Sequence, residues 1–180
     1  MKSFFVFLTV ALTALNMTGR AEDMPAMTKM RVKRVPPRTF LCTKQQLKIE
    51  EVPDFIRRSV KPLAQAAMDL KVGPAGPTVT SYLGYRGDPS QSFTAELDIP
   101  ALQTAAQYKG PFYFRSAPEF KCASMIFQGS IKDIGSAWRS LVEQATEGDL
   151  KPTGNSREVY LSWEGEDSDN NVVELQLGVE

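Results

Sequence analysis

Two stretches of the chain carry apolar residues at the spacing of an α-helix. In the first stretch the apolar positions are Val52, Ile56, Val60, Leu63, Ala67 and Leu70. In the second they are Ile131, Ile134, Trp138, Leu141, Val142 and Ala145. Ser130 followed by Asp133 gives the second stretch a start similar to a capping box, and Pro62 predicts a kink or a restart inside the first. The pattern predicts two helices that each bury one face.

Segments with the composition of β-strands precede and follow each predicted helix. The expected strands are, in chain order, 39–47, 79–85, 93–99, 111–114, 120–127, 158–163 and 172–177. Turn residues such as Gly87 and Pro89 join the strands into hairpins, and residues 100–110 are expected to be a linker. Two helices that pack on one face of antiparallel strands form an α+β fold.

The order strand, helix, strand, strand occurs twice, and the residues repeat with it. When residues 74–97 are placed on 152–175 without a gap, an offset of 78, eight of the 24 positions are identical. Further upstream the offset is 82, because Ile49 then falls on Ile131 and Arg57 on Arg139. The four extra residues predict a first helix one turn longer than the second. We interpret the chain as a tandem duplication with halves 38–100 and 111–180.

Several motifs of the two halves resemble the gyrase-inhibitor-like, AraC-type effector-binding domain of the SOUL-like superfamily. They are G-P-x-x-x-S-Y-L from Gly76, A-E-L-D-I-P from Ala95, R-E-V-Y-L from Arg157 and V-E-L-Q-L from Val173. The resemblance covers residues 38–180. It implies that the halves pack about a pseudo-twofold axis, with a groove between them for small aromatic or cationic ligands. The acid of the family's Glu-x-Tyr pattern falls on Glu158, whereas Gly178 replaces the expected proline.

Glu158 is the strongest candidate for a ligand contact. Strand alternation places it beside Tyr160, whereas Val159, Leu161 and Trp163 share the opposite, apolar face, which we expect to meet the helices. A carboxylate beside aromatic rings attracts organic cations. In the other half Glu158 corresponds to Thr80, so this acid has no twin, although a solvated strand glutamate fits the pattern too. The predicted ligand-binding residues are Glu158, Tyr160, Tyr82, Phe112, Phe114 and Trp163.

The amino-acid composition limits which catalytic, metal-binding and disulfide chemistry the chain can carry. The sequence contains no histidine, which removes the usual general base and the commonest metal and haem ligand, so neither a metal nor a cofactor is expected. Cys42 and Cys122 are either a disulfide or two buried free thiols. The acidic loop 164–171 lacks the ligand spacing of an EF-hand and is expected to be a solvated turn.

The first residues have the order of a secretory signal, a charge followed by an apolar run and small residues. Residues 1–21 are therefore expected to be a signal peptide, and the 12-residue run from Phe4 to Leu15 is too short for a stable membrane anchor. Residues 22–37, rich in basic residues and proline, are expected to be a disordered arm. Without Lys2 and Arg20 the chain has 19 basic and 21 acidic residues, so nucleic acid is not an expected partner.

These observations predict a periplasmic or secreted module that binds a small organic molecule rather than a conventional enzyme. Two alternatives stay open. Glu158 could act as the base that activates water against a strained, electrophilic ring compound. The chain could instead bind a protein of the cell envelope.

Overall fold

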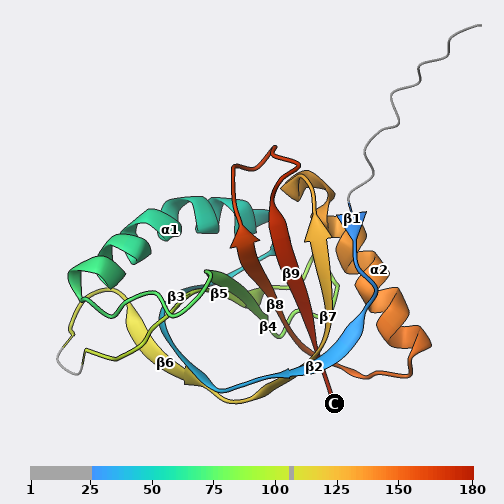
Figure 1. The fold of residues 1–180 in the computed structure, drawn as a ribbon, viewed down its shortest axis with the longest axis horizontal. Helices are drawn as coiled ribbons and strands as arrows, with labels where there is room; N and C mark the ends of the chain where they lie inside the picture. Colours follow the sequence, from blue (N-terminus) through green and yellow to red (C-terminus); the bar gives the residue numbers. More distant parts are fainter. Residues whose placement is uncertain (1–25, 106–107) are drawn as a thin grey trace, which may run out of the picture.

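The computed structural model describes residues 26–105 and 108–180, which form nine strands and two α-helices (Figure 1). The strands are β1 (Ala26–Met27), β2 (Arg31–Val35), β3 (Arg38–Leu47), β4 (Val79–Leu83), β5 (Phe93–Pro100), β6 (Tyr113–Ala117), β7 (Phe120–Gln128), β8 (Pro152–Ser162) and β9 (Val172–Val179). The helices are α1 (Val52–Asp69) and α2 (Ile134–Glu147), preceded by the 3-10 turns η1 (Ile49–Glu51) and η2 (Ile131–Asp133). The predicted signal peptide, residues 1–21, lies outside the described residues. No helix of the described part is long and apolar enough to cross a membrane.

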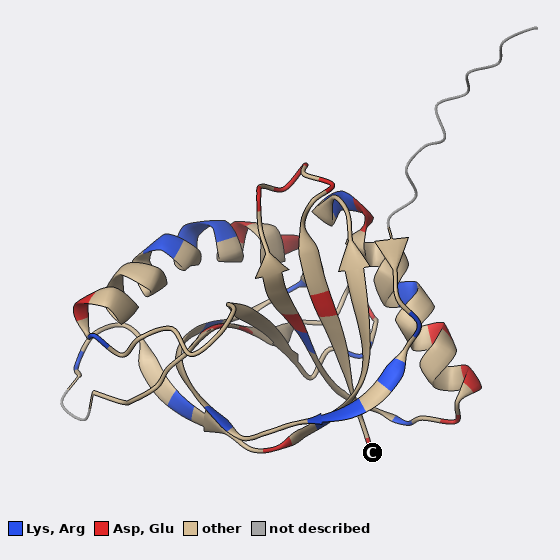
Figure 2. Cartoon of the chain, viewed as in Figure 1, with Lys and Arg blue, Asp and Glu red and all other residues tan. Residues whose placement is uncertain are grey.

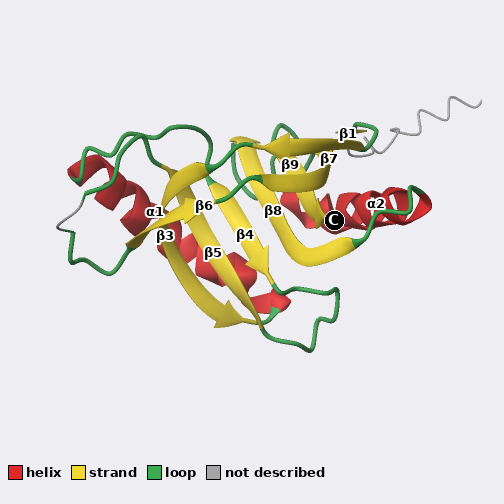
Figure 3. Cartoon of the chain, turned by 90° about the horizontal axis from the view of Figure 1, so that it is seen from below, coloured by secondary structure: helices red, strands yellow, loops and turns green. Residues whose placement is uncertain are grey.

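All nine strands belong to one antiparallel sheet, and both helices lie on the same face of it (Figure 3), which confirms the α+β prediction. The strand order is β1-β7-β9-β8-β4-β5-β3-β6, with β2 also paired to β7. The elements β3-η1-α1-β4-β5 recur in the same order as β7-η2-α2-β8-β9. The two groups meet where β4 pairs with β8, so this pair is the junction between the halves.

The helices have the predicted difference in length. Helix α1 has 18 residues and α2 has 14, so the first is longer by the expected four. Helix α1 continues through Pro62 as a single helix, and the predicted restart at this residue is therefore wrong. Proline removes one backbone hydrogen bond, but the buried apolar face on both sides of it, which includes Phe55, Leu63 and Ala67, holds the helix against the sheet.

Each half buries its own apolar core between its helix and its strands. In the first half, Leu63 of α1 packs with Leu41, Leu97 and Ile99 of the strands. The core of the second half consists of Ala123, Met125, Phe127, Ala137, Leu141, Ala145, Val173, Leu175, Leu177 and Val179. The strand residues follow the expected alternation, since every second side chain of β5 and β9 faces a helix. Two separate cores leave room between the helices.

The N-terminal segment is ordered in part, and the prediction of a disordered arm over 22–37 is wrong for residues 26–27 and 31–35. Strand β1 pairs with β7 from Ala26↔Gln128, and β2 pairs with it from Arg31↔Ser124 to Val35↔Phe120. Figure 2 shows β2, which carries several basic residues, running alongside β7. The segment folds because it covers the edge of β7, which would otherwise expose unpaired backbone groups.

The pairing of β2 also closes the sheet on itself. Beyond Pro36 and Pro37, β3 pairs with β6 in the same register, since Arg38↔Ala117 continues the ladder that ends at Val35↔Phe120. Strands β2 and β3 thus form one line that runs along β6 and β7, beneath the rest of the sheet in Figure 1. The sheet is therefore curled, and its face opposite the helices lies on the inner side of the curl.

Buried ion pairs and hydrogen bonds fill the inside of the curl. Asp98 accepts a hydrogen bond from Ser81 at 2.7 Å and one from Arg115 at 2.9 Å. On the other side, Glu174 is paired with Lys33 of β2 and accepts a hydrogen bond from Ser124. Burial raises the pKa of Glu174, but the bonds from Lys33, Ser124 and Gln176 outweigh it and leave this pKa below its ordinary value of 4.5.

Cys42 and Cys122 are free and fully buried, so the disulfide alternative is wrong and the two cysteines are thiols. Cys42 lies on β3 and Cys122 on β7, and four strands, β9, β8, β4 and β5, separate them along the sheet. Burial raises the pKa of the Cys122 thiol to about 11, which keeps it protonated and unreactive at neutral pH.

Replacing Lys33 by Met should lower the free energy of unfolding by roughly 1–2 kcal/mol at pH 7, because Glu174 then lies buried without its cation. Since the folded pKa of Glu174 is depressed, its contribution is present above pH 4.5 and is lost as the pH falls through the folded value. The difference between wild type and Lys33→Met in urea unfolding should therefore shrink below pH 4. Arg31→Gln, on the same strand and exposed, is the control and should change stability by less than about 0.5 kcal/mol. Equal effects of the two substitutions would contradict the role of the pair.

Candidate functional site

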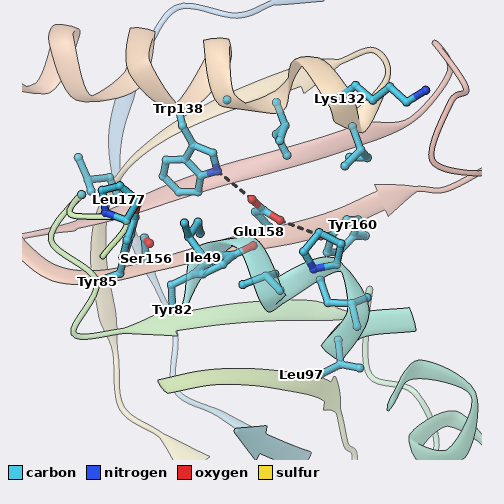
Figure 4. Close-up of a pocket in the computed structure, with 18 of the residues that line it drawn as sticks. Ile49, Tyr82, Tyr85, Leu97, Lys132, Trp138, Ser156, Glu158, Tyr160 and Leu177 are labelled. Carbon is cyan, nitrogen blue, oxygen red and sulfur yellow. Dashed lines mark hydrogen bonds between the residues drawn. The ribbon is translucent and has the colours of Figure 1, made fainter. Parts of the chain in front are cut away.

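A cleft of about 1530 Å³ lies between the two helices. The N-terminal halves of α1 and α2 form its walls, and β4 and β8 form its floor (Figure 4). The loops after β4 and β8 lie at its two ends, represented by Tyr85 and Trp163. The cleft therefore sits over the junction between the halves.

Most residues that line the cleft come in pairs related by the offsets of the sequence. On the helices the offset is 82, in the pairs Ile49 and Ile131, Val52 and Ile134, Ile56 and Trp138, Arg57 and Arg139, and Val60 and Val142. On the strands and loops it is 78, in the pairs Tyr82 and Tyr160, Tyr85 and Trp163, and Gly87 and Gly165. Thr80 and Glu158 also differ by 78, and they are direct partners in the β4–β8 ladder. A local twofold axis through the cleft would pass between these two residues.

Glu158 lies at the centre of the floor and is only 6% exposed. One carboxylate oxygen accepts a hydrogen bond from the indole Nε1 of Trp138 at 2.8 Å, and the other accepts one from the hydroxyl of Tyr160 at 2.7 Å (Figure 4). Among the described residues, no lysine or arginine nitrogen lies within 4 Å of this carboxylate. The buried charge is held by neutral donors alone.

Two tyrosines beside Glu158 are kept protonated. Burial raises the pKa of both Tyr82 and Tyr160, and the negative charge of Glu158 raises each further. Protonated phenols donate hydrogen bonds and add no charge of their own. The floor of the cleft therefore carries one negative charge within a largely aromatic surface.

Aromatic rings extend from the floor to both ends of the cleft. At one end the rings of Tyr160 and Trp163 meet edge to face, with centroids 5.6 Å apart. At the other end the ring centroids of Tyr85 and Phe93 are 4.9 Å apart, and those of Phe93 and Tyr82 are 5.9 Å apart. The cleft thus offers flat apolar surfaces on both sides of the central acid.

The structure reverses the predicted direction of the β8 side chains. Glu158 and Tyr160 face the helices, whereas Val159 packs on the opposite face with Phe40 and Val79. The prediction is wrong because the helices diverge over β4 and β8, so that polar side chains on their side of the sheet enter the cleft instead of the core. Trp163 follows the end of β8 and a register shift at Tyr160, and it returns to the cleft side.

Of the predicted ligand-binding residues, the cleft brings together Glu158, Tyr160, Tyr82 and Trp163. The other two, Phe112 just before β6 and Phe114 within β6, lie outside it and pack against the core of the first half. They line a separate hollow of about 450 Å³ that also contains Tyr108 and Arg115. Ligand contact by any of these residues stays a prediction.

Trp138 is a site residue that the sequence pattern did not reveal. It lies on the apolar stripe of α2 and was expected to be core, but its indole N–H reaches Glu158. The available signal was its counterpart in the duplication, since Ile56 stands at the same place in α1. Trp138 stands where the first half has Ile56, and Glu158 stands where it has Thr80. These two residues of the second half hydrogen-bond to each other.

No cluster of three or more Cys, Asp or Glu side chains in residues 26–105 and 108–180 is arranged to hold a metal ion. The polar chemistry described above consists of one carboxylate, two phenols and one indole. These groups can accept a cation, donate hydrogen bonds and stack on flat rings.

Comparison with known proteins gives one family and a set of similar structures. The profile of the family described as GyrI-like small molecule binding domain matches residues 28–180. No protein of curated function matches the sequence. The structure of SAV2435 bound to tetraphenylphosphonium is similar, with a TM-score of 0.64 at 12% identity, over 85% of this chain and 94% of that chain.

Two further structures have the same fold. The C-terminal domain of EcmrR matches with a TM-score of 0.64 at 18% identity, over 84% of this chain and 97% of that chain. A structure described as a hydrolase from Listeria innocua matches with a TM-score of 0.60 at 14% identity, over 84% of this chain and 92% of that chain. At these identities the similarity shows the fold alone.

Replacing Trp138 by Phe should lower the free energy of unfolding by roughly 1–3 kcal/mol, because the ring is retained but a buried carboxylate oxygen loses its donor. Trp163→Phe is the matched control. Trp163 is 50% exposed and should change stability by less than about 0.5 kcal/mol. Urea unfolding at pH 7 measures both. A Trp138→Phe protein as stable as the control would show that the indole does not hold Glu158.

Proposed function

Because the chain belongs to the family of GyrI-like small molecule binding domains, we propose that its cleft binds an organic cation that carries flat apolar groups. One observation carries this proposal. Glu158 is a buried carboxylate at the centre of an aromatic cleft, and only neutral donors contact it. A cationic ligand would supply the charge that this carboxylate lacks.

The energy of the buried acid favours this class of ligand. A carboxylate loses its hydration on burial, and hydrogen bonds from an indole and a phenol replace only part of it. A small hydrated cation would have to give up its own water to reach the floor. An organic cation with a diffuse charge is weakly hydrated, and its charge interacts favourably both with Glu158 and with the faces of Tyr160 and Trp163.

The size of the cleft also supports a ligand with several apolar groups. Its volume of about 1530 Å³ exceeds the roughly 300–1,000 Å³ of ordinary small-molecule pockets. The rings at its two ends lie on either side of Glu158, so a central cation with groups on both sides matches the arrangement. SAV2435 bound to tetraphenylphosphonium, a similar fold, makes that cation a suitable probe.

The contacts of Glu158 favour binding over the hydrolytic alternative. A general base must accept a proton from water, yet each oxygen of Glu158 already accepts a hydrogen bond from Trp138 or Tyr160. These donors fix the position of the carboxylate between α2 and β8. They suit a fixed counter-charge for a ligand.

We also propose that the protein acts outside the cytoplasm, in the periplasm or after secretion. The charged, apolar and small-residue order of residues 1–21 supports this proposal. Expression of the full chain in a Gram-negative host should place a shortened protein, beginning after Ala21, in the periplasmic fraction. Full-length protein retained in the cytoplasm would contradict export.

Tetraphenylphosphonium should bind the protein, and Glu158→Gln should weaken binding by at least about tenfold, because it removes the negative charge and keeps the size of the side chain. Isothermal titration calorimetry measures both affinities. Glu147→Gln removes an exposed charge at the end of α2, outside the cleft, and should leave the affinity unchanged.

Tetraphenylborate, which has the same four rings and the opposite charge, completes this test. It should bind more weakly than the phosphonium, and Glu158→Gln should remove most of that difference. If both ions bind equally to the wild type, the cleft selects for shape alone and the proposed role of Glu158 is wrong.

A further inference from the structure

We propose that the ligand also carries an anionic group, which Arg86 and Arg139 bind at the end of the cleft next to the β4–β5 loop. The ligand class would then be a zwitterionic amphiphile, with its cation at Glu158 and its acid at this end. This inference rests on the proposed function, because it assumes that a ligand occupies the cleft. It adds a second polar contact at a defined place.

The two ends of the cleft differ in charge although their residues correspond. At the end formed by the β8–β9 loop, Arg57 of α1 reaches Glu166 of the loop at 3.2 Å and also pairs with Asp54. Lys132, at the start of η2, is paired with Asp167 of the same loop. Arg57 and Lys132 are therefore neutralised within the protein, whereas Lys61, one turn after Arg57 in α1, lines the cleft without an ion pair within 4 Å among the described residues.

At the other end the corresponding carboxylate forms no ion pair, although Glu143, one turn after Arg139 in α2, also lines the cleft. Arg139 of α2 corresponds to Arg57, and Asp88 of the β4–β5 loop corresponds to Glu166. Asp88 accepts hydrogen bonds from the backbone N–H of Ser90 at 2.9 Å and from its hydroxyl at 2.7 Å. In the described part of the chain, no ion pair within 4 Å engages Arg139.

A second cation stands at this end. Arg86 occupies the place where the other loop has the acid Glu164, and no carboxylate of the described residues lies within 4 Å of it either. Its side chain lies along Gly154 of β8, where a Cβ would come within 3.6 Å of its Cγ and 3.8 Å of its Nε. These are ordinary contact distances, so Arg86 packs against Gly154 beside the cleft, and it is the left-handed conformation, with φ 83°, that favours glycine here.

Guanidinium groups bind carboxylates, sulfonates and phosphates through paired N–H donors. Arg86 and Arg139 both line the cleft and are exposed, so the anionic group would bind at its mouth rather than on its floor. Gly154 precedes Glu158 by four residues in β8, which is at most about 13 Å, because the strand is irregular between Pro152 and Ser156. A cation at Glu158 and an anion at Arg86 are therefore separated by a spacer of several carbons.

A matched pair of probes tests the proposal. The first is benzyldimethylhexylammonium, and the second is the same ion with a sulfonate at the end of the hexyl chain. Calorimetry at low salt should show that the sulfonate compound binds the wild type about tenfold more tightly, because its sulfonate can pair with Arg86 and Arg139. The cation, ring and chain are the same in both probes, so the sulfonate alone accounts for any difference. Equal or weaker binding of the sulfonate compound overturns the proposal.

Substitutions locate the contact. Arg86→Gln and Arg139→Gln should each reduce the preference for the sulfonate compound severalfold, and neither should weaken the binding of the plain ammonium, because each removes a positive charge. Arg58→Gln, an exposed position on α1 outside the cleft, should keep the full preference. A preference that survives both cleft substitutions also overturns the proposal.

The same titrations separate this inference from the proposed function. If neither probe binds the wild type, or if Glu158→Gln leaves both affinities unchanged, the proposed function fails. If the plain ammonium binds in a manner that depends on Glu158 and the sulfonate gives no gain, the proposed function stands and only the anionic contact is wrong. Thermal unfolding of each variant without ligand confirms that it is folded.

Discussion

The antiparallel pairing of β4 with β8 is the contact on which the cleft depends. It joins two groups of elements that each have their own helix and their own apolar core. Because the cores are separate, the helices diverge above the junction and leave the helix-side face of β4 and β8 uncovered. The register of this pair then sets Thr80 opposite Glu158 and brings Tyr82 and Tyr160 onto the same floor. A shift of one residue would turn Glu158 to the other face of the sheet.

The polarity of the cleft comes from differences between corresponding positions. Where the residues of the halves agree, as with Tyr82 and Tyr160, they build a cleft with similar ends. Where they differ, as with Thr80 and Glu158, they place charge on one side only. Trp138 is a further difference of this kind, because its indole N–H donates a hydrogen bond to Glu158, an acid that the first half lacks. The residues that agree at corresponding positions thus give the site its shape, and the residues that differ give it its chemistry.

The sequence was sufficient for the order of the predicted elements, the relative lengths of the helices and the proximity of Glu158, Tyr160 and Tyr82, which line one cleft. Local periodicity carries part of this information, and the comparison of the sequence with itself carries the rest. It was insufficient for contacts between distant segments. The basic, proline-containing arm is typical of disorder, and its contacts with distant residues, the ladder with β7 and the ion pair with Glu174, explain why β2 is ordered. Likewise, alternation shows that Glu158 and Val159 point in opposite directions, but the position of the helices decides which one enters the cleft.

Strand β2 has a consequence for the behaviour of the protein in solution. By pairing with β7 it occupies a long row of backbone donors and acceptors on that strand, from Phe120 to Ser124. An uncovered edge of this kind is a template on which further chains can add in β-fashion. By covering this edge, the N-terminal segment prevents another chain from pairing with β7. A truncated chain that starts after Val35 would keep both cores and the cleft, yet it would expose a surface prone to aggregation.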